Sequence, residues 1–304
     1  MMLIFFIDKG IICLLIQSRE VTGMKERLLA FLLALSVLFA VPAAFAEDDD
    51  WDDEDWGDDE FEDFEEEEEE VDFKNIAGYP QSNQKINSGD FSYLLNDDDT
   101  VSLCGYIGTG VDVVIPETLD EHEIISITNN AFAYNTTIET LVMPKSLRYI
   151  DTMAFTQCAK LKKVVLNEGL LIIGDCAFGG DAMLEEINLP DTVEKIGIAC
   201  FAACVKLTEI TFGAAIESTG VQAFHSCTGL KEIVFSSSIT TVDNESFFGC
   251  ASLENVTINP ELETIGPKAF SGCVALSSIK IPESTEIDDS AFEGCSDEFI
   301  ITRE

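Results

Sequence analysis

Residues 265–282 read IGPKAFSGCVALSSIKIP, and the phenylalanine in this stretch, Phe270, marks one unit of a repeat. Equivalent phenylalanines recur at successive spacings of 23, 23, 23, 23, 23, 23 and 22 residues. They are Phe132, Phe155, Phe178, Phe201, Phe224, Phe247, Phe270 and Phe292. A fixed period of this length is typical of solenoids, in which each unit forms one coil.

The residues around each phenylalanine repeat as well. A leucine or isoleucine follows it by six residues in seven units, and an aliphatic residue follows by nine. An isoleucine or valine precedes it by five residues in every unit except that of Thr219, at Ile127, Ile150, Ile173, Ile196, Val242, Ile265 and Ile287. A unit of 23 residues is too small to bury its own apolar side, so neighbouring coils must stack and share one core.

The segment from eight to eleven residues after each phenylalanine alternates between polar and apolar residues, as a half-buried strand does. Stacked in register, these segments would form a parallel sheet with strands about 4.8 Å apart. The Ala-Phe-x-x-Cys segment has helical spacing, which predicts a short helical turn. The sequence therefore predicts a right-handed leucine-rich-repeat solenoid of about eight 23-residue coils, with parallel β-strands and short helical turns.

The unit at 265–282 resembles those of the BspA-like leucine-rich-repeat family, and the likeness extends over roughly 91–304. The stretches that begin at Phe91 and Tyr106 are similar to the lead-in that precedes the first full repeat of that family. This resemblance implies an extracellular, often adhesive protein without catalytic residues. Residues 91–304 are thus expected to form the solenoid, with an N-terminal β cap that turns at Asn96–Asp99.

The chain from Met24 reads as a secretory signal peptide, with Lys25 and Arg27 ahead of an apolar run and small residues at Ala44 and Ala46. We expect translation to begin at Met24, cleavage after Ala46, and 1–46 to be absent from the mature protein. The apolar run is shorter than the roughly 20 residues that a membrane span requires. The expected location is therefore secreted or cell surface, with no membrane span after cleavage.

Residues 47–90 are expected to form an acidic, disordered linker. Between Glu47 and Glu70, 19 of 24 residues are Asp or Glu, and no periodic apolar face is present. The tract has no glycine turn with ligands at fixed spacing, so we expect only weak, diffuse cation binding at 47–70. A formal net charge of −40 makes nucleic acid an unfavourable partner.

Six cysteines fall three residues after a landmark phenylalanine, and Asn135 and Asp181 interrupt this column. They are Cys158, Cys204, Cys227, Cys250, Cys273 and Cys295. Parallel side chains on successive coils disfavour disulfide torsions, so buried free thiols are the favoured interpretation, although export usually brings disulfides. We predict no metal site, because the sequence has no Cys-x-x-Cys pair.

Enzymatic function is not expected, and neither is a cofactor. His122 and His225 are the only histidines, and the column of cysteines already explains Cys227 beside His225. No phosphate-binding glycine loop is present, and acidic residues are too numerous to single out a catalytic pair.

Side chains eight and ten residues after each phenylalanine should point away from the core and form a recognition face. An ordinary solvated sheet surface is the alternative interpretation of this face. The candidate partner-binding residues are Lys163, Glu186, Glu209, Glu232, Asn255, Val142, Val165 and Val234.

The favoured function is an adhesin-like module that binds a protein ligand, such as a host or microbial surface protein, through this strand face. The alternative is a structural or assembly protein of the cell envelope that displays the acidic tail and has no host ligand. The sequence leaves both open, because repeat solenoids carry their specificity on outward residues.

Overall fold

The computed structural model describes residues 2–7, 10–15, 80 and 84–304. The first two segments contain β1 (Met2–Ile7) and β2 (Gly10–Leu15), which pair as a two-stranded sheet. The signal peptide predicted from Met24 and the acidic tract at 47–70 lie outside the described residues. The fold described below is that of residues 84–304.

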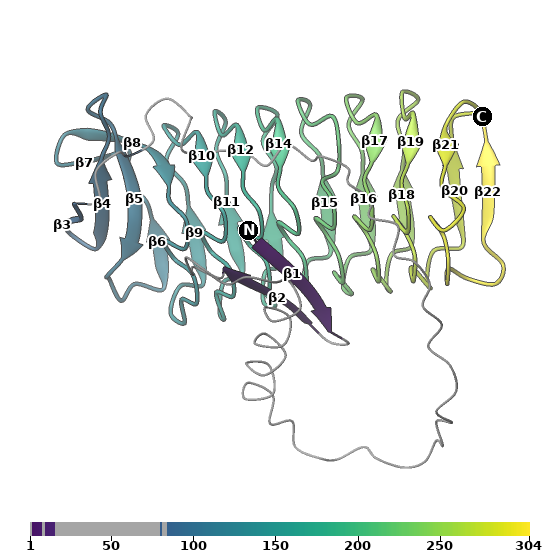
Figure 1. The fold of residues 1–304 in the computed structure, drawn as a ribbon, viewed down its shortest axis with the longest axis horizontal. Coiled ribbons are helices and arrows are strands. Elements are labelled where there is room, and N and C mark those ends of the chain that lie inside the picture. The colour runs from purple at the N-terminus through teal and green to yellow at the C-terminus, as the bar shows by residue number, and fades with distance from the viewer. Residues whose placement is uncertain (1, 8–9, 16–79, 81–83) are drawn as a thin grey trace, which may run out of the picture. The chain divides into compact units, whose positions relative to one another are not determined.

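Residues 84–304 form a parallel β-solenoid of about nine turns of about 23 residues, which confirms the predicted fold class (Figure 1). Each coil contributes one strand to a row of parallel strands along one side of the solenoid, which we call the first strand stack. This stack consists of β6 (Asp112–Val114), β9 (Thr140–Val142), β11 (Lys163–Val165), β13 (Glu186–Ile187), β15 (Glu209–Thr211), β16 (Glu232–Val234), β18 (Asn255–Thr257), β20 (Ser278–Ile281) and β22 (Ile300–Arg303).

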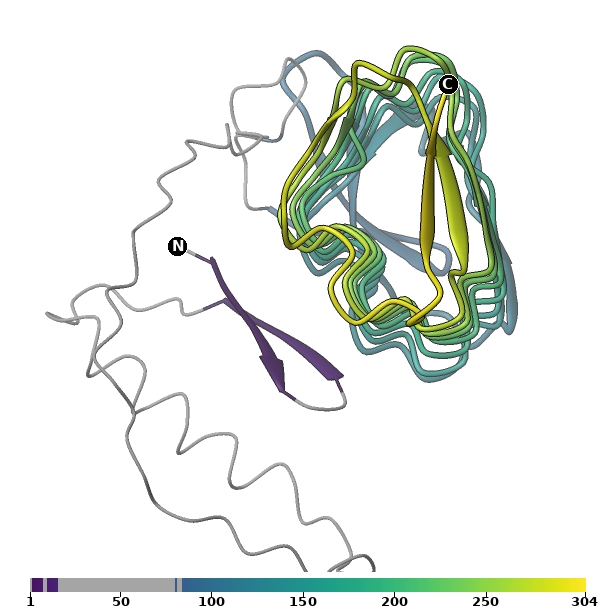
Figure 2. The same ribbon diagram turned by 90° about the vertical axis from the view of Figure 1, so that its right-hand side faces the viewer.

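The second strand stack lies on another side of the coils. It consists of β5 (Val101–Tyr106), β8 (His122–Ile127), β10 (Tyr149–Ile150), β12 (Ile172–Ile173), β14 (Lys195–Ile196), β17 (Thr241–Val242), β19 (Thr264–Ile265) and β21 (Glu286–Ile287). Paired residues on full coils are 23 positions apart, as in Leu141 with Val164 and Ile210 with Ile233. Viewed along the stack, the successive coils superpose (Figure 2).

The coil of Thr219 lacks a strand in the second stack and keeps only an isolated bridge between Ser218 and Thr241. Thr219 replaces the usual isoleucine and is fully buried. Its hydroxyl oxygen lies 2.7 Å from Ser246 Oγ and accepts the amide of Asp243 at 2.9 Å. The polar substitution is tolerated because these contacts satisfy the buried hydroxyl.

The prediction of short helical turns is wrong, because the Ala-Phe-x-x-Cys segments are successive turns and residues 84–304 contain no helix. In every segment except the last, two residues have positive φ, at two positions before and two positions after the phenylalanine. Around Phe155 these are Met153 at 57° and Gln157 at 54°. A helix needs consecutive residues with negative φ, so this alternation excludes one. With no helix in the described part, none there is long and apolar enough to cross a membrane.

Hydrogen bonds between coils hold the turn segments in this unusual conformation. The amides of Met153, Phe155 and Gln157 donate to the carbonyls of Asp175, Ala177 and Gly179 on the next coil, at 2.8, 2.8 and 2.9 Å. A left-handed residue costs roughly 1–2 kcal/mol, whereas each hydrogen bond returns on the order of 1 kcal/mol. The turn is therefore stable only because a neighbouring coil accepts its amides.

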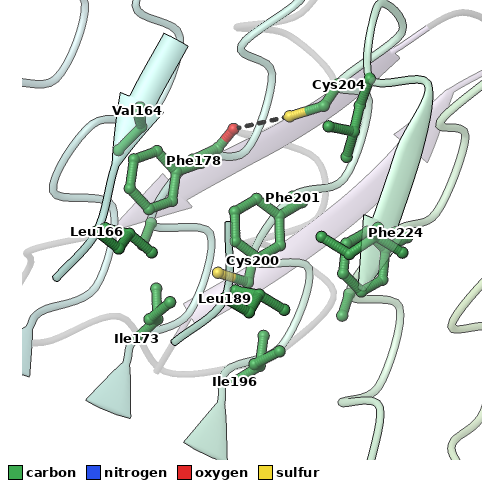
Figure 3. Packing of buried hydrophobic residues seen from close by; sticks show 14 of the residues in the cluster. Val164, Leu166, Ile173, Phe178, Leu189, Ile196, Cys200, Phe201, Cys204 and Phe224 are labelled. Atoms are coloured by element: carbon green, nitrogen blue, oxygen red, sulfur yellow. Dashed lines mark hydrogen bonds between the residues drawn. The ribbon is translucent and has the colours of Figure 1, made fainter. Parts of the chain in front are cut away.

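The landmark phenylalanines form a continuous stack in the core. Neighbouring ring centroids are 4.9 to 5.4 Å apart, and their planes differ by 2° to 27°. Phe178, Phe201 and Phe224 are fully buried and pack against the aliphatic residues of both strand stacks (Figure 3). The ring spacing is close to that of parallel strands, so each coil adds one ring.

All six cysteines of the repeated column are free thiols, which confirms the interpretation from sequence. Each thiol donates to the carbonyl of the landmark phenylalanine on the preceding coil, as Cys204 does to Phe178 at 3.3 Å (Figure 3). The equivalent distances elsewhere in the column are 3.2 or 3.3 Å. Burial raises the pKa of the Cys227 thiol to about 12, so this thiol stays protonated and unreactive at neutral pH.

The two residues that interrupt the cysteine column behave differently. Asn135 accepts the amides of Thr137 and Ile138, both at 2.8 Å, and is only half-buried. Asp181 is fully buried, and its Oδ1 accepts the Cys158 amide at 2.6 Å. Its Oδ2 has no hydrogen-bond partner within the described coils. Desolvation therefore raises the pKa of Asp181 well above its usual value.

An antiparallel hairpin covers the N-terminal end of the core. β4 (Phe91–Leu95) pairs with β5 and with β3 (Ile86–Ser88), and β7 (Thr118–Leu119) pairs with β8. Phe91 and Tyr106 continue the aromatic stack, with Tyr106 6.0 Å from Phe132. As a result, Phe132 at this end is only 3% exposed.

Candidate partner-binding face

The candidate residues lie on the outward side of the first strand stack, which we call the strand face. Alternation along each strand sends Val164, Ile210 and Ile233 into the core, where they are at most 1% exposed. The polar residue before each of these core positions points to solvent. Lys163, Glu186, Glu209, Glu232 and Asn255 are all exposed on the strand face.

Lys163 and Glu186 are partners in the register between β11 and β13 and form an ion pair through Lys163 Nζ and Glu186 Oε2. Their side chains are 49% and 64% exposed, so the pair adds little stability. Lys162 and Glu139 form a second ion pair beside it, at 2.6 Å. The charges on this part of the face therefore neutralise one another.

Glu209 and Glu232 face each other directly across β15 and β16, and Glu232 is in register with Asn255 on β18. None of the ion pairs within residues 84–304 includes either glutamate. Like charges directly opposite each other on a sheet are destabilising. The geometry thus leaves one uncompensated acidic pair in the middle of the strand face.

The three glutamates of the strand face, Glu186, Glu209 and Glu232, are not joined by one continuous set of strand pairs. β13 and β15 belong to separate hydrogen-bonded sheets, so no ladder pair joins Glu186 to Glu209. The Asn188 amide bonds back to the backbone of Leu166, at 3.1 and 3.3 Å, next to this break. Strand pairing therefore places Glu186 beside Lys163 and Glu209 beside Glu232.

Valines form a second feature of the face. Val142 and Val165 are in register on β9 and β11, and both are half-buried. Val114 on β6 extends this row, in register with Val142, and is 68% exposed. Val234 is half-buried and lies apart from the row, between Thr211 and Thr257.

Sequence reasoning missed Val114, because Val114 lies outside the repeat marked by the phenylalanines. The signal that would have found it is the similarity of Val113-Val-Ile-Pro116 to the strand segments that end later units.

The strands of the first strand stack contain no histidine or cysteine. Within the described residues, no group of three or more His, Cys, Asp or Glu side chains is arranged to hold a metal ion. The pKa of His225 is lowered to about 4 by burial, and its ring stacks on Phe248 at 4.8 Å. His122 lies in β8, with Nδ1 2.9 Å from the carbonyl oxygen of Asp99. The face offers acidic and aliphatic groups on a rigid sheet, which suits it to non-covalent binding.

The family model "BspA type Leucine rich repeat region" matches residues 122–250 and 172–298, with six copies of the repeat. These ranges cover most of the solenoid. No curated protein matches the chain.

Solved structures with a similar fold are bacterial leucine-rich-repeat proteins. A leucine-rich-repeat protein of T. pallidum is 27% identical, with a TM-score of 0.59, over 64% of this chain and 91% of that chain. A leucine-rich-repeat protein of Bacteroides ovatus is 23% identical, with a TM-score of 0.54, over 72% of this chain and 67% of that chain. A leucine-rich cell surface protein of Faecalibacterium prausnitzii is 20% identical, with a TM-score of 0.54, over 73% and 77% of the two chains.

Proposed function

Because the chain belongs to the BspA-type leucine-rich-repeat family, we propose that it is a secreted or cell-surface protein that binds other proteins through its strand face. The observation that carries this proposal is the uncompensated pair of Glu209 and Glu232. Like charges that face each other destabilise a sheet, and a cationic partner that neutralises them removes this repulsion. The partner is therefore expected to present lysine or arginine side chains to the middle of the face.

The row of Val114, Val142 and Val165 supports the same proposal. Half-buried and exposed aliphatic side chains in register form an apolar strip beside the charged rows. Protein interfaces combine an apolar centre with a polar rim, and this part of the strand face has both elements. The charge pair would then select the partner, and the valines would add apolar contact area.

Export is part of the proposal. Met24–Ala46 would be removed, and the acidic residues 47–70 would separate the solenoid from the new N-terminus. N-terminal sequencing of the protein from culture medium or from the cell surface tests this step. A mature chain that begins at Glu47 is expected, and a chain that retains Met24–Ala46 would contradict it.

Binding is tested by pull-down from host extracellular matrix and, separately, from the envelope of the producing cell. The matched bait is the Glu209→Lys/Glu232→Lys double variant, which reverses the charges without touching the core. Proteins captured by the wild type and lost by the variant support the strand face. Identical capture by both baits contradicts it, and capture from the envelope alone favours the assembly role.

A further inference from the structure

The first strand stack ends at an unpaired strand edge near the N-terminal cap. β6 pairs with β9 on one side only, and Val111 accepts the Glu139 and Thr140 amides at 2.8 and 3.2 Å while Ile115 donates to Val142 at 3.0 Å. Backbone groups alternate in direction along a strand, so those of residues 112 and 114 point away from β9. No described strand pairs with that edge.

The second strand stack shows how such an edge is covered in the same molecule. There β5 is followed by β4 and β3, which continue the sheet beyond the coils. β6 has no counterpart to this hairpin among the described strands. The difference leaves the backbone donors and acceptors of Asp112 and Val114 available for another strand.

Exposed apolar side chains are concentrated on β6 and in the loop that enters it. Ile107 is 53% exposed, Val111 46% and Val114 68%. Nine large apolar residues are exposed in residues 84–304. Three of these nine lie within the eight residues from Ile107 to Val114. Val114 also begins the row that continues through Val142 and Val165. A cluster of this kind next to an open edge is typical of an interaction site rather than of scattered surface residues.

The charge at this edge is acidic. The amides of Ile107 and Gly108 donate to the carbonyl of Asp90 at 2.8 and 3.2 Å, which places Asp90 beside the loop that enters β6. Asp112 lies on β6 itself and accepts the Thr140 hydroxyl at 2.6 Å. Neither aspartate takes part in an ion pair within residues 84–304. A second copy of this chain, with a formal net charge of −40, would be repelled, whereas a basic segment would be attracted.

We propose that the free edge of β6 receives an extended, basic and aliphatic segment of a partner protein, which adds a strand to the first strand stack. Backbone hydrogen bonds to Asp112 and Val114 would supply affinity, and side-chain pairs would supply specificity. Asp112 and Val114 point to the same side because they are two residues apart. The added strand therefore places a basic residue opposite Asp112 and an aliphatic residue opposite Val114. This inference rests on the proposed protein-binding function and adds the edge of β6 to the strand face as a second binding surface.

The probe is a synthetic peptide with the core Lys-Val-Val-Val-Lys, flanked by Gly and Ser and blocked at both ends. Its outward positions carry Lys, Val and Lys, so either strand direction matches Asp112 and Val114. A peptide with the core Glu-Val-Val-Val-Glu controls for charge. The Lys-Val-Val-Val-Lys peptide with all three valines N-methylated controls for backbone hydrogen bonding in either strand direction, because it lacks the amide protons that would face β6.

The variants test whether binding depends on the edge of β6 rather than on exposed valines in general. Val114→Pro removes an amide that points away from β9, a position where a sheet tolerates proline. Val114→Lys keeps the amide but places a positive charge and a longer side chain at the edge, and serves if the proline variant fails to fold. Val274→Lys makes the same change at a valine of similar exposure, 59% against 68%, that lies outside both the edge and the strand face.

Calorimetry on the full chain is expected to show saturable binding of the lysine peptide and at least about tenfold weaker binding of both control peptides. Val114→Pro and Val114→Lys are each expected to weaken binding at least about tenfold, while Val274→Lys binds as the wild type does. Equal binding by wild type and both Val114 variants would overturn the proposal, as would absence of saturable binding. Self-association that is lost in Val114→Pro would overturn it in favour of a second copy. Loss of pull-down partners in the Glu209/Glu232 variant concerns the face alone, so the two proposals fail separately.

Discussion

The inward and outward columns of the same strands obey different constraints. On β16, Ile233 faces the core and is completely buried, while Glu232 next to it is exposed. Inward positions on the neighbouring strands are again aliphatic, whereas the outward positions change from lysine to glutamate to asparagine along the stack. Each inward side chain is covered by the coils on either side, so the repeat fixes its size and polarity. Outward side chains are not covered by neighbouring coils, so their size and charge can vary. We therefore expect the outward side chains to determine which partner binds.

The largest effect is expected for an inward residue with coils on both sides. Phe201→Ala removes a fully buried ring that stacks on Phe178 at 5.4 Å and on Phe224 at 5.2 Å. We expect a loss of about 3–5 kcal/mol in the free energy of unfolding, measured by urea denaturation. The expected loss is large because removal of the ring leaves a cavity between the rings of Phe178 and Phe224 on the two neighbouring coils.

Phe292→Ala in the last coil is the matched control. Phe292 stacks on Phe270 at 5.4 Å and contacts Phe299 at 4.8 Å, but it is only half-buried. We expect a smaller loss of about 1–2 kcal/mol. Equal losses for the two variants would show that burial by neighbouring coils does not set the stability of the stack.

The columns inside the solenoid were predictable from sequence because a period of 23 residues repeats the same local environment. The left-handed residues were not, because alanine, methionine and glutamine have no intrinsic preference for positive φ. Met153, Gln157 and Ala199 adopt it because the next coil accepts their amides, a contact that local sequence does not reveal.

On the outward side, the positions of candidate residues were predictable, but their pairing was not. Lys163 and Glu186 meet because β11 and β13 share a register, and the break after β13 separates Glu186 from Glu209. The Asn188 side chain bonds to the backbone of Leu166 on the preceding coil next to this break, a contact that the repeat pattern does not reveal. β6 was also missed as a ninth strand, since no landmark phenylalanine marks its coil.

An intermediate effect is expected where a polar residue occupies an inward column. Asp181→Asn replaces a buried carboxyl group whose folded-state pKa is raised by desolvation. With the folded pKa above the unfolded one, stability is complete below the unfolded value of about 3.9 and declines as pH rises towards the folded pKa. The wild type is therefore expected to lose stability from pH 4 upwards, while the asparagine variant changes less.

Urea denaturation from pH 4 to pH 8 tests this expectation. At pH 7 we expect Asp181→Asn to be more stable than the wild type, because an amide neither takes up a proton nor bears a buried charge. The advantage should shrink as the pH falls to 4. Asp297→Asn, which changes an exposed aspartate, is the control and should follow the wild type. Parallel pH profiles for wild type and Asp181→Asn would show that the Asp181 carboxyl does not titrate differently on folding.

The smallest effect is expected on the outward side, where removal of one charge tests the repulsion between facing glutamates. Glu209→Gln relieves the contact with Glu232 and should raise the free energy of unfolding by about 0.2–1 kcal/mol at low salt. Glu186→Gln instead breaks the exposed ion pair with Lys163, so its effect should be zero or of opposite sign. Both differences should fade in 1 M NaCl, where the Debye length is about 3 Å. A stabilisation by Glu209→Gln that persists in high salt would point to packing or hydrogen bonding as its source, and would remove the electrostatic reason for a cationic partner at the middle of the strand face.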